Sequence, residues 1–531
     1  KQSLSKEGWH FATQSDTEVV VAAYAAWGTA CLSRFDGMFA LAIWDEQEQV
    51  LFAARDTFGE KPLFFFRDAD TFCFASEMKA LWSLGISRDV NRALLYNFIS
   101  IGYTGNPSDP METFYRDIHK LPAASFLSYA FRTDQLVLET YRQQQYPEVK
   151  EPENEEAVIE QFRTLLIQSV KRRLRSDVSI GTSLSGGLDS SSIVALCAQE
   201  QGTRYSHKAF TAVFPGFEKN EQPYAEAVAR RFGLEQHQVA VETGDIPSLM
   251  ERVMYYQEEP FSSGSVLAQF RVYEEARKAG VKVLLDGQGA DETLAGYTQY
   301  YRWYWRELFR NKSLQASGER AAIQQMGLKL SFGWSQKAAA LFPDFAMSLQ
   351  QSRKSKQSYR NSDLNRDFAF ENKRNLYYTL PAIPDLNGVL YYQTYVNGLE
   401  ELLRLADRNS MASATEVRLP FLSYELVDFV FSLPSRYKIR KGWTKWLLRK
   451  AMENDLPEAI VWRKDKVGFE PPQRVWMQDT HVQEAIREGK RKLVDEGVLD
   501  ASVLSKKIQP HTAYAAENRE WRYWSAAYLF T

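Results

Sequence analysis

Apolar residues in the first 140 positions form short runs that are separated by polar turns. The runs at 38–44 and 50–54 flank a wholly polar stretch, which is the pattern of a β-hairpin. The runs at 63–66 and 72–75 flank a second polar turn in the same way. Positions 17–26 instead have helical spacing. We therefore expect an antiparallel sheet with a few helices in this part of the chain.

The composition changes between residues 141 and 157, where Gln, Pro and Glu replace almost all apolar residues. Such a stretch favours a linker between two folded parts. We therefore predict two domains, at residues 1–145 and 155–531.

Beyond this linker, segments with the helical spacing of apolar residues alternate with strand-like apolar runs. Apolar positions at 158–174 have helical spacing, and strand-like runs then alternate with helices, at 178–184, 210–214, 239–241 and 281–285. This alternation predicts a parallel α/β sheet. After about residue 297 we expect the strands to stop and the chain to be helical to its end.

Composition narrows the class of protein. The chain has 531 residues, of which 44% are apolar and 14% aromatic, too many for a disordered protein. Its 65 basic and 67 acidic side chains almost cancel, which argues against nucleic acid or an anionic membrane as the main partner. The longest apolar run, 19–32, is shorter than the roughly 20 residues of a membrane span.

Three cysteines, Cys31, Cys73 and Cys197, are too few and too widely spaced for a disulfide framework or a zinc site. We expect inert thiols in a reducing, cytoplasmic compartment. The six histidines also lack metal-ligand spacing.

The most informative stretch is Ser185-Gly186-Gly187-Leu188-Asp189-Ser190, which follows an alternating strand and precedes an apolar helix. Glycines permit a tight turn, and the hydroxyl and N–H groups at a helix start form a cradle for phosphate oxygens. No Gly-Lys-Ser/Thr follows, so this is not a Walker A loop. A glycine turn without a ligand has the same spacing. However, the six residues resemble the loop of the N-type ATP pyrophosphatases, which grip the β,γ-pyrophosphate of ATP.

A second loop, Asp286-Gly287-Gln288-Gly289-Ala290-Asp291-Glu292, follows the strand-like run 281–285. Ligands in open α/β sheets bind at the carboxyl ends of strands, so we expect the two loops to meet there. Asp189 and Asp291 would then supply oxygen ligands to Mg²⁺ on the pyrophosphate. Without such a ligand, Asp291 and Glu292 are acids at a helix start, favoured by the helix dipole.

Ordered matches along nearly the whole chain resemble the glutamine-dependent asparagine synthetase family. In the carboxyl half they lie at 185–190, 210–216, 258–261, 286–292, 407–412, 416–422 and 466–469. In the amino half they lie at 15–19, 36–40, 54–56, 59–63 and 75–77, and resemble the later part of a class II glutaminase.

The resemblance implies an Ntn-hydrolase-like α/β/β/α amino domain, incomplete at its start, and a parallel α/β ATP pyrophosphatase domain with a large helical extension. It implies that the first domain hydrolyses glutamine and that the second converts aspartate and ATP into β-aspartyl-AMP. Ammonia from glutamine would then displace AMP to give asparagine. Family members are often dimers, so a homodimer is a further expectation.

The family's site residues carry over by position. Its ATP contacts fall on Ser183, Ser185, Gly186, Gly187, Asp189, Ser190, Ala212, Asp286 and Gly287. The pyrophosphate lysine falls on Lys466, although two lysines before a glycine turn are usually a solvated loop. Asp16 matches the carboxylate that holds the α-amino group of glutamine, a charge-assisted pair. The implied catalytic set is Gln288, Lys466, Asp189 and Asp291.

Two departures from the family pattern stand out. The family nucleophile is an amino-terminal cysteine. This chain instead begins with Lys1, and the sequence that follows resembles the interior of the glutaminase domain. We therefore expect the native chain to be longer. Gln288 stands where well-known members carry glutamate.

A glutamine cannot take a proton, although it can hydrogen-bond a carboxylate or an amide. The change at Gln288 is a tolerated variation, or ammonia needs no base there, or the enzyme activates a carboxylic acid other than aspartate. A homologue that binds nucleotide without catalysis is a further alternative.

Overall fold

The computed structural model describes residues 1–142, 146–201, 207–328, 330–464 and 468–531. The chain divides into two compact units. The first comprises Lys1–Ser87, Pro110–Glu112 and Asp117–Gln145, and the second comprises Arg88–Asp109, Thr113–Arg116 and Tyr146–Thr531.

The first unit contains two antiparallel sheets. One has the order β1-β2-β6-β7, formed by β1 (Ala40–Asp45), β2 (Val50–Arg55), β6 (Ser125–Ala130) and β7 (Gln135–Thr140). The other has the order β4-β3-β5, formed by β4 (Phe72–Ala75), β3 (Phe64–Arg67) and β5 (His119–Lys120). Both predicted hairpins, β1–β2 and β3–β4, are therefore confirmed.

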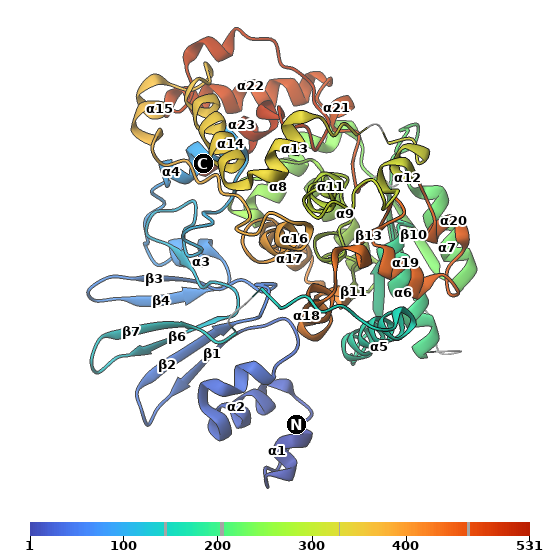
Figure 1. Ribbon diagram of the computed structural model, residues 1–531. Helices are drawn as coiled ribbons and strands as arrows, with labels where there is room; N and C mark the ends of the chain where they lie inside the picture. Colours follow the sequence, from blue (N-terminus) through green and yellow to red (C-terminus); the bar gives the residue numbers. More distant parts are fainter. Residues whose placement is uncertain (143–145, 202–206, 329, 465–467) are drawn as a thin grey trace. The chain divides into compact units, whose positions relative to one another are not determined.

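The two sheets pack face to face between helices (Figure 1). Alternation along β2 sends Ala53 toward the second sheet, into a cluster with Phe65 and Leu127. Phe52 and Ala54 point to the opposite face, which α2 (Asp16–Trp27) covers. Helix α3 (Met78–Trp82) contacts β3 and β4. The four layers have the α/β/β/α order that the family resemblance implies. A short helix, α1 (Gln2–Lys6), precedes them.

The second unit is built on a five-stranded parallel sheet with the order β10-β9-β8-β11-β12. The strands are β8 (Ile180–Ser183), β9 (Lys208–Val213), β10 (Glu235–Ala240), β11 (Val283–Leu285) and β12 (Glu416–Arg418). The first four overlap the strands expected from the alternating pattern, although β10 begins four residues before the predicted run 239–241, in a polar segment that gave no strand signal. The chain moves outward from β8 to β9 and β10, then returns to place β11 on the other side of β8.

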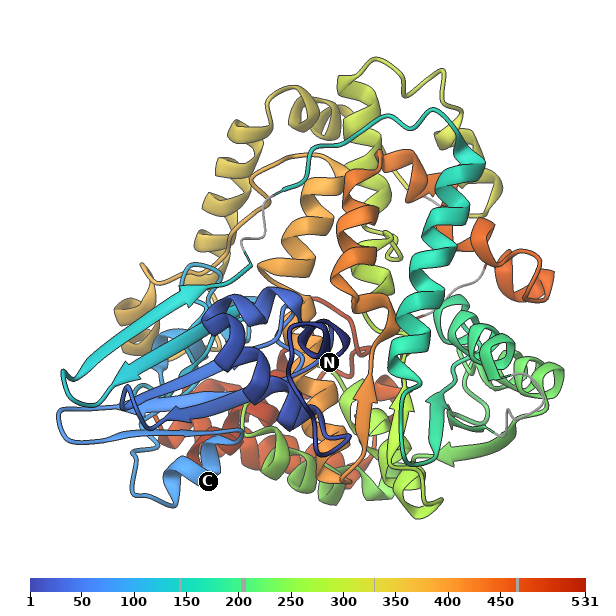
Figure 2. The same ribbon diagram turned by 90° about the horizontal axis from the view of Figure 1, so that it is seen from below.

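Helices cover both faces of this sheet (Figure 2). On one face α5 (Glu155–Arg173), α6 (Leu188–Gln201) and α7 (Gln222–Phe232) share a core with Leu184 and Leu285. On the other face α9 (Ser265–Lys278) packs Val272 and Tyr273 against Phe210 and Leu284. The sheet is thus enclosed on both sides, as a parallel sheet requires.

The expectation that strands stop after residue 297 is wrong in two places. β12 adds a fifth strand beside β11, and β13 (Ile439–Arg440) pairs with β14 (Trp443–Thr444). These strands have two or three residues each, too few to show a period of two. Backbone pairing, which leaves no pattern in the side chains, holds them in place.

The remaining elements are helical, as expected. They are α4 (Arg92–Ile101), α8 (Ile246–Gln257), α10 (Ala290–Thr293), α11 (Tyr300–Arg310), α12 (Glu319–Gln325), α13 (Trp334–Leu341), α14 (Pro343–Tyr359), α15 (Arg366–Asn372), α16 (Leu386–Tyr395), α17 (Leu399–Ala412), α18 (Tyr424–Ser432), α19 (Trp446–Met452), α20 (Glu458–Val461), α21 (Gln473–Trp476), α22 (Thr480–Asp495) and α23 (Arg519–Ala527), with short 3-10 turns between some of them. Among the described residues, none of the helices is long and apolar enough to span a bilayer.

The cysteines are free thiols, as expected, and Cys31 and Cys197 are buried. Burial raises the pKa of the Cys31 thiol to about 11, and it raises the pKa of Cys197 further. Both therefore stay protonated and poorly nucleophilic near neutral pH.

Lys438 is a buried lysine whose titration gives a stability prediction. Its Nζ donates to the carbonyl of Leu433 at 2.5 Å, and burial lowers its pKa to about 7 from an ordinary value of 10.5. Between those two values the unfolded chain binds more protons than the folded chain, so stability rises with pH. We expect the free energy of unfolding to gain about 1.4 kcal/mol per pH unit from this group between pH 7.5 and 9.

Urea denaturation across that pH range measures the slope, which Lys438→Met should remove. The same substitution at Lys171, whose side chain is 56% exposed, is the control and should retain the slope. An unchanged slope in Lys438→Met would contradict the assignment.

Candidate functional site

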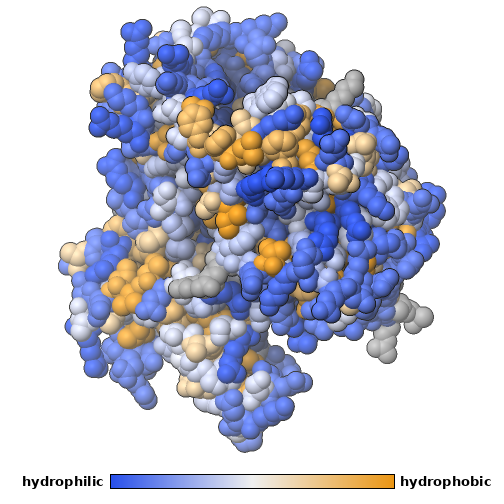
Figure 3. Space-filling view, in the orientation of Figure 1, coloured by the Kyte–Doolittle hydropathy of each residue, from blue (hydrophilic) through white to orange (hydrophobic). Residues whose placement is uncertain are grey.

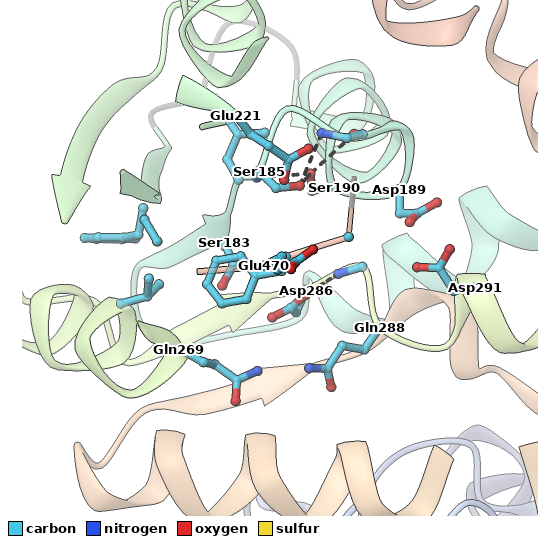
Figure 4. A pocket seen from close by; sticks show the side chains of 18 of the residues that line it. Ser183, Ser185, Asp189, Ser190, Glu221, Gln269, Asp286, Gln288, Asp291 and Glu470 are labelled. Carbon is cyan, nitrogen blue, oxygen red and sulfur yellow. Dashed lines mark hydrogen bonds between the residues drawn. The ribbon is translucent and has the colours of Figure 1, made fainter. Parts of the chain in front are cut away.

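The site lies at the point where the strand order of the second unit reverses. The loop 185–190 follows β8, and the loop 286–291 follows its neighbour β11. Chain connections leave these two strands in opposite directions, which opens a crevice at their carboxyl ends. Both loops line one pocket there (Figure 4). The expectation that they meet is borne out by this geometry.

The first loop is held in shape by its own hydroxyl groups. The hydroxyls of Ser185 and Ser190 are 3.2 Å apart, and the Ser185 N–H donates to Ser190 Oγ at 3.3 Å. The Gly187 N–H in turn donates to Ser185 Oγ at 3.2 Å. Since Leu188 begins α6, these groups surround the amino end of a 14-residue helix, where an anion is favoured.

Two glycines allow the loops to pack closely. Gly186 has φ +73°, and a Cβ atom on it would lie 2.3 Å from the backbone N of Ala225. A Cβ on Gly287 would lie 2.9 Å from Cβ of Asp189 and 3.1 Å from the N of Ser190. Gly287 therefore sets the contact between the two loops, while Gly186 packs against α7.

A lysine that the sequence analysis missed joins the two aspartates. Lys445 is only 1% exposed, and its Nζ lies 2.5 Å from Asp189 Oδ2 and 2.6 Å from Asp291 Oδ1. A Cβ on Gly296 would lie 1.6 Å from Asp291 Oδ1 and 2.5 Å from Lys445 Cε, so this glycine leaves room for the pair. The two carboxylates thus converge on one cation, the Lys445 ammonium.

Beside this cluster, burial raises the pKa of two further carboxyl groups. The pKa of Glu292 rises to about 7, and Tyr297 donates to its Oε1 at 2.5 Å. The pKa of Asp286 also rises, while hydrogen bonds from the Gly287 N–H and the Tyr273 hydroxyl act in the opposite direction.

The opposite wall of the pocket is apolar. Phe210 and Ala212 of β9, Val272 of α9, Phe214 and Phe469 line it. At its edge the Lys219 ammonium pairs with Glu470 at 2.7 Å. The pocket therefore joins an apolar slot, formed by these side chains, to a charged end that contains the serine loop.

Two side-chain amides lie at a third side of the pocket (Figure 4). The Nδ2 group of Asn409 donates to Oε1 of Gln269 at 3.0 Å, so the NH₂ group of Gln269 is left to face the pocket. Gln288 lies beside it, and its buried Oε1 accepts no hydrogen bond from any described residue. These amides offer donors and an acceptor to a polar ligand.

The other predicted site residues are distributed as follows. Ser183, Ser185, Gly187, Asp189, Ser190, Ala212, Asp286, Gly287, Gln288 and Asp291 line the pocket. Lys466 lies outside the described residues. Asp16 is in the first unit, exposed at the first position of α2, where its carboxylate accepts the Thr17 N–H at 2.8 Å.

Several residues of the site carried no signal in the sequence. Lys219, Gln269 and Glu470 line the pocket, and Lys445 contacts its Asp189 and Asp291, but all four come from segments far from either glycine loop.

Both parts of the chain match known protein families. Residues 161–530 match the asparagine synthase family, and residues 1–142 match a glutamine amidotransferase domain. "Asparagine synthetase [glutamine-hydrolyzing] 1" of Bacillus subtilis is 28% identical over 98% of this chain and 80% of its own length. "Asparagine synthetase [glutamine-hydrolyzing] 3" of the same organism is 28% identical over 87% of this chain and 72% of its own.

Proposed function

Because the chain belongs to the asparagine synthase family, we propose that it is an ATP-dependent, glutamine-hydrolysing ligase that makes asparagine from aspartate and releases AMP and pyrophosphate. The observation that carries the proposal is the pair of loops at the crevice between β8 and β11, which bring Asp189 and Asp291 to one cation. We assign the glutaminase to residues 1–145 and the synthetase to residues 155–531.

In this proposal ATP lies along the pocket. Its pyrophosphate end occupies the serine loop, where N–H groups and hydroxyls at the start of α6 bind phosphate oxygens. Its adenine occupies the apolar slot beside Ala212, Phe210 and Val272. The α-phosphorus then lies between these ends, facing Gln269 and Gln288.

Two steps follow. A carboxylate oxygen of the acid attacks the α-phosphorus, and the bond to the β-phosphate oxygen breaks, releasing pyrophosphate. Ammonia then attacks the acyl carbon of the adenylate, the bond to AMP breaks, and the amide nitrogen loses a proton. Gln288 does not take that proton, because a side-chain amide is not a base. We assign Gln288 and Gln269 to orienting the acid.

The family resemblance implies Mg²⁺, and the residues present fit it. Asp189 and Asp291 are hard oxygen ligands that already converge on the Lys445 ammonium. They would hold the ion, which when bound neutralises charge on the departing pyrophosphate. Lys445 and Lys466 add positive charge from the protein itself.

In the amino half, we propose that Asp16 holds the α-amino group of glutamine, since a carboxylate pairs well with an ammonium group. It is exposed, so a ligand reaches it without rearrangement of the core. We also propose a reducing, cytoplasmic compartment, in keeping with three free thiols.

Product analysis tests the proposed function. With ATP, Mg²⁺, aspartate and ammonia, the protein should yield AMP, pyrophosphate and asparagine in equal amounts. Using ammonia makes the result independent of the amino half. ADP as product would overturn the proposal, as would ATP binding without turnover. AMP formation that requires another carboxylic acid in place of aspartate would assign a different acceptor.

Gly287→Ala tests the contact between the loops. The added methyl group must push Asp189 and Ser190 aside, and overpacking of this kind costs about 1–3 kcal/mol. We expect ATP affinity, measured by calorimetry, to fall roughly ten-fold or more. Gly244→Ala is the control, because no atom lies within 4 Å of its added Cβ. Equal affinity in both variants would show that the loops do not position the nucleotide.

A further inference from the structure

One surface of the second unit concentrates positive charge. Residues 302–360 carry eleven Lys and Arg against three Asp and Glu, although the whole chain has a formal net charge of −2. Two of the three acids, Glu307 and Glu319, are largely buried and accept backbone N–H groups. Among the residues that the structure describes, cations are therefore in excess at the surface of α11–α14.

Four of these cations, Arg310, Lys312, Arg320 and Lys337, line a groove of about 760 Å³. Within the ranges that the structure describes, none of the four forms an ion pair. The apolar side chains of Phe309, Leu314 and Leu341 line the same groove. The groove thus combines unneutralised cations with hydrocarbon, an arrangement that suits an anionic head attached to an apolar chain.

An exposed apolar stripe continues from the groove. Trp334 is 86% exposed, Phe342 65% and Phe345 67%, and Leu341 and Leu349 are also exposed. Phe345 and Leu349 are four residues apart, so they share one face of α14, and Phe342 directly precedes this helix. Figure 3 shows apolar side chains gathered over α13 and α14, with hydrophilic side chains around them. Lys337 lies over the Trp334 ring, 5.2 Å from its centroid.

We propose that the basic-aromatic face, formed by α11–α14, docks on the surface of an anionic phospholipid bilayer. Aromatic side chains enter the interface between headgroups and acyl chains, while Lys and Arg pair with lipid phosphates and carboxylates. The remainder of the chain is net acidic, so the electric field of an anionic membrane repels it and turns the basic-aromatic face toward the membrane. Docking in this way needs no spanning helix.

Other occupants fit less well. A second copy of the face would bring like charges together, which is unfavourable. A nucleic acid would use the cations, but exposed Leu341 and Leu349 offer it neither stacking nor hydrogen bonds. A protruding Trp334 suits a deformable interface better than a rigid protein surface, which would need a matching pocket.

Sedimentation with lipid vesicles tests the proposal on the full chain. At about 0.1 M salt we expect at least ten-fold tighter binding to vesicles of phosphatidylcholine with phosphatidylserine than to phosphatidylcholine alone. At about 1 M salt, where the Debye length is about 3 Å, this preference should disappear. A triple variant, Trp334→Ser with Phe342→Ser and Phe345→Ser, should lose at least ten-fold in affinity for the mixed vesicles.

Matched controls separate this face from general effects. Tyr255→Ser removes a 64% exposed aromatic side chain elsewhere and should bind as the native chain does. Lys312→Glu with Lys337→Glu should abolish the preference, whereas the same charge change at Lys171 and Lys278 should not. Unchanged thermal unfolding of each variant shows that it is folded.

Absence of binding to the mixed vesicles, or binding that survives the triple substitution, would overturn the proposal. Binding to duplex DNA without binding to vesicles would do the same and would assign the face to a polyanion. Because pyrophosphate release is measured separately with ammonia, failure here leaves the proposed function intact.

Discussion

Replacing Asp189 by asparagine should lower ATP-dependent pyrophosphate release at least about 100-fold, the usual effect of removing a group that stabilises transition-state charge. Asparagine keeps the size of the side chain and an oxygen for Lys445, but it loses the negative charge that a divalent cation needs. Because Asp189 lies at the start of α6 and not in the apolar core, the loss should appear in kcat and in the Mg²⁺ requirement. Pyrophosphate release measured over a range of Mg²⁺ concentrations checks this.

Asp363→Asn is the matched control. Asp363 also accepts from a lysine, Lys506, at 2.5 Å, but it does not line the pocket. Its variant should retain native turnover. If Asp189→Asn turns over as fast as Asp363→Asn at every Mg²⁺ concentration, the metal assignment at Asp189 is wrong. Native-like thermal unfolding of both variants would exclude misfolding as the cause.

The sequence predicted the parts of the fold that depend on local pattern. The alternation of strands and helices from 158 to 285 is a local property, since each buried strand and each amphipathic helix repeats over several residues. The hairpins of the first unit follow from the same periodicity. The two glycine loops were placed at one edge because parallel strands end on the same side of a sheet. These predictions did not depend on any contact between residues that are far apart in the sequence.

The features that the sequence did not predict depend on contacts between residues that are far apart in the chain. β12 has three residues, of which Glu416 and Arg418 are polar, and only its pairing with β11 makes it a strand. Lys445 reaches Asp189 and Asp291 because α19 packs on α5 in the core of the second unit, a contact that no residue spacing near either loop predicts. Gln269 is one of several polar residues on α9, and its hydrogen bond from Asn409 alone distinguishes it.

Lys445, Asp189 and Asp291 form a cluster that organises the site before substrate binds. Two carboxylates that must later share a divalent cation are held together by the Lys445 ammonium, which is nearly excluded from water. Without a cation, their mutual repulsion would separate the two loops. Lys445 therefore serves as a positioning residue for Asp189 and Asp291 as well as a source of positive charge.

Lys445→Met should consequently lower the free energy of unfolding by about 3 kcal/mol without Mg²⁺, the lower end of the cost of breaking a buried pair, because both carboxylates remain partly exposed. Mg²⁺ should restore part of this loss, since an ion that binds only the folded state stabilises it. Lys490→Met is the control: Lys490 is 2% exposed and its Nζ lies 2.6 Å from Glu520, but the pair is not in the pocket. Its variant should be destabilised without responding to Mg²⁺. Thermal unfolding of both variants with and without Mg²⁺ tests this prediction. If Mg²⁺ stabilised the two variants equally, Lys445 would not be part of the metal site.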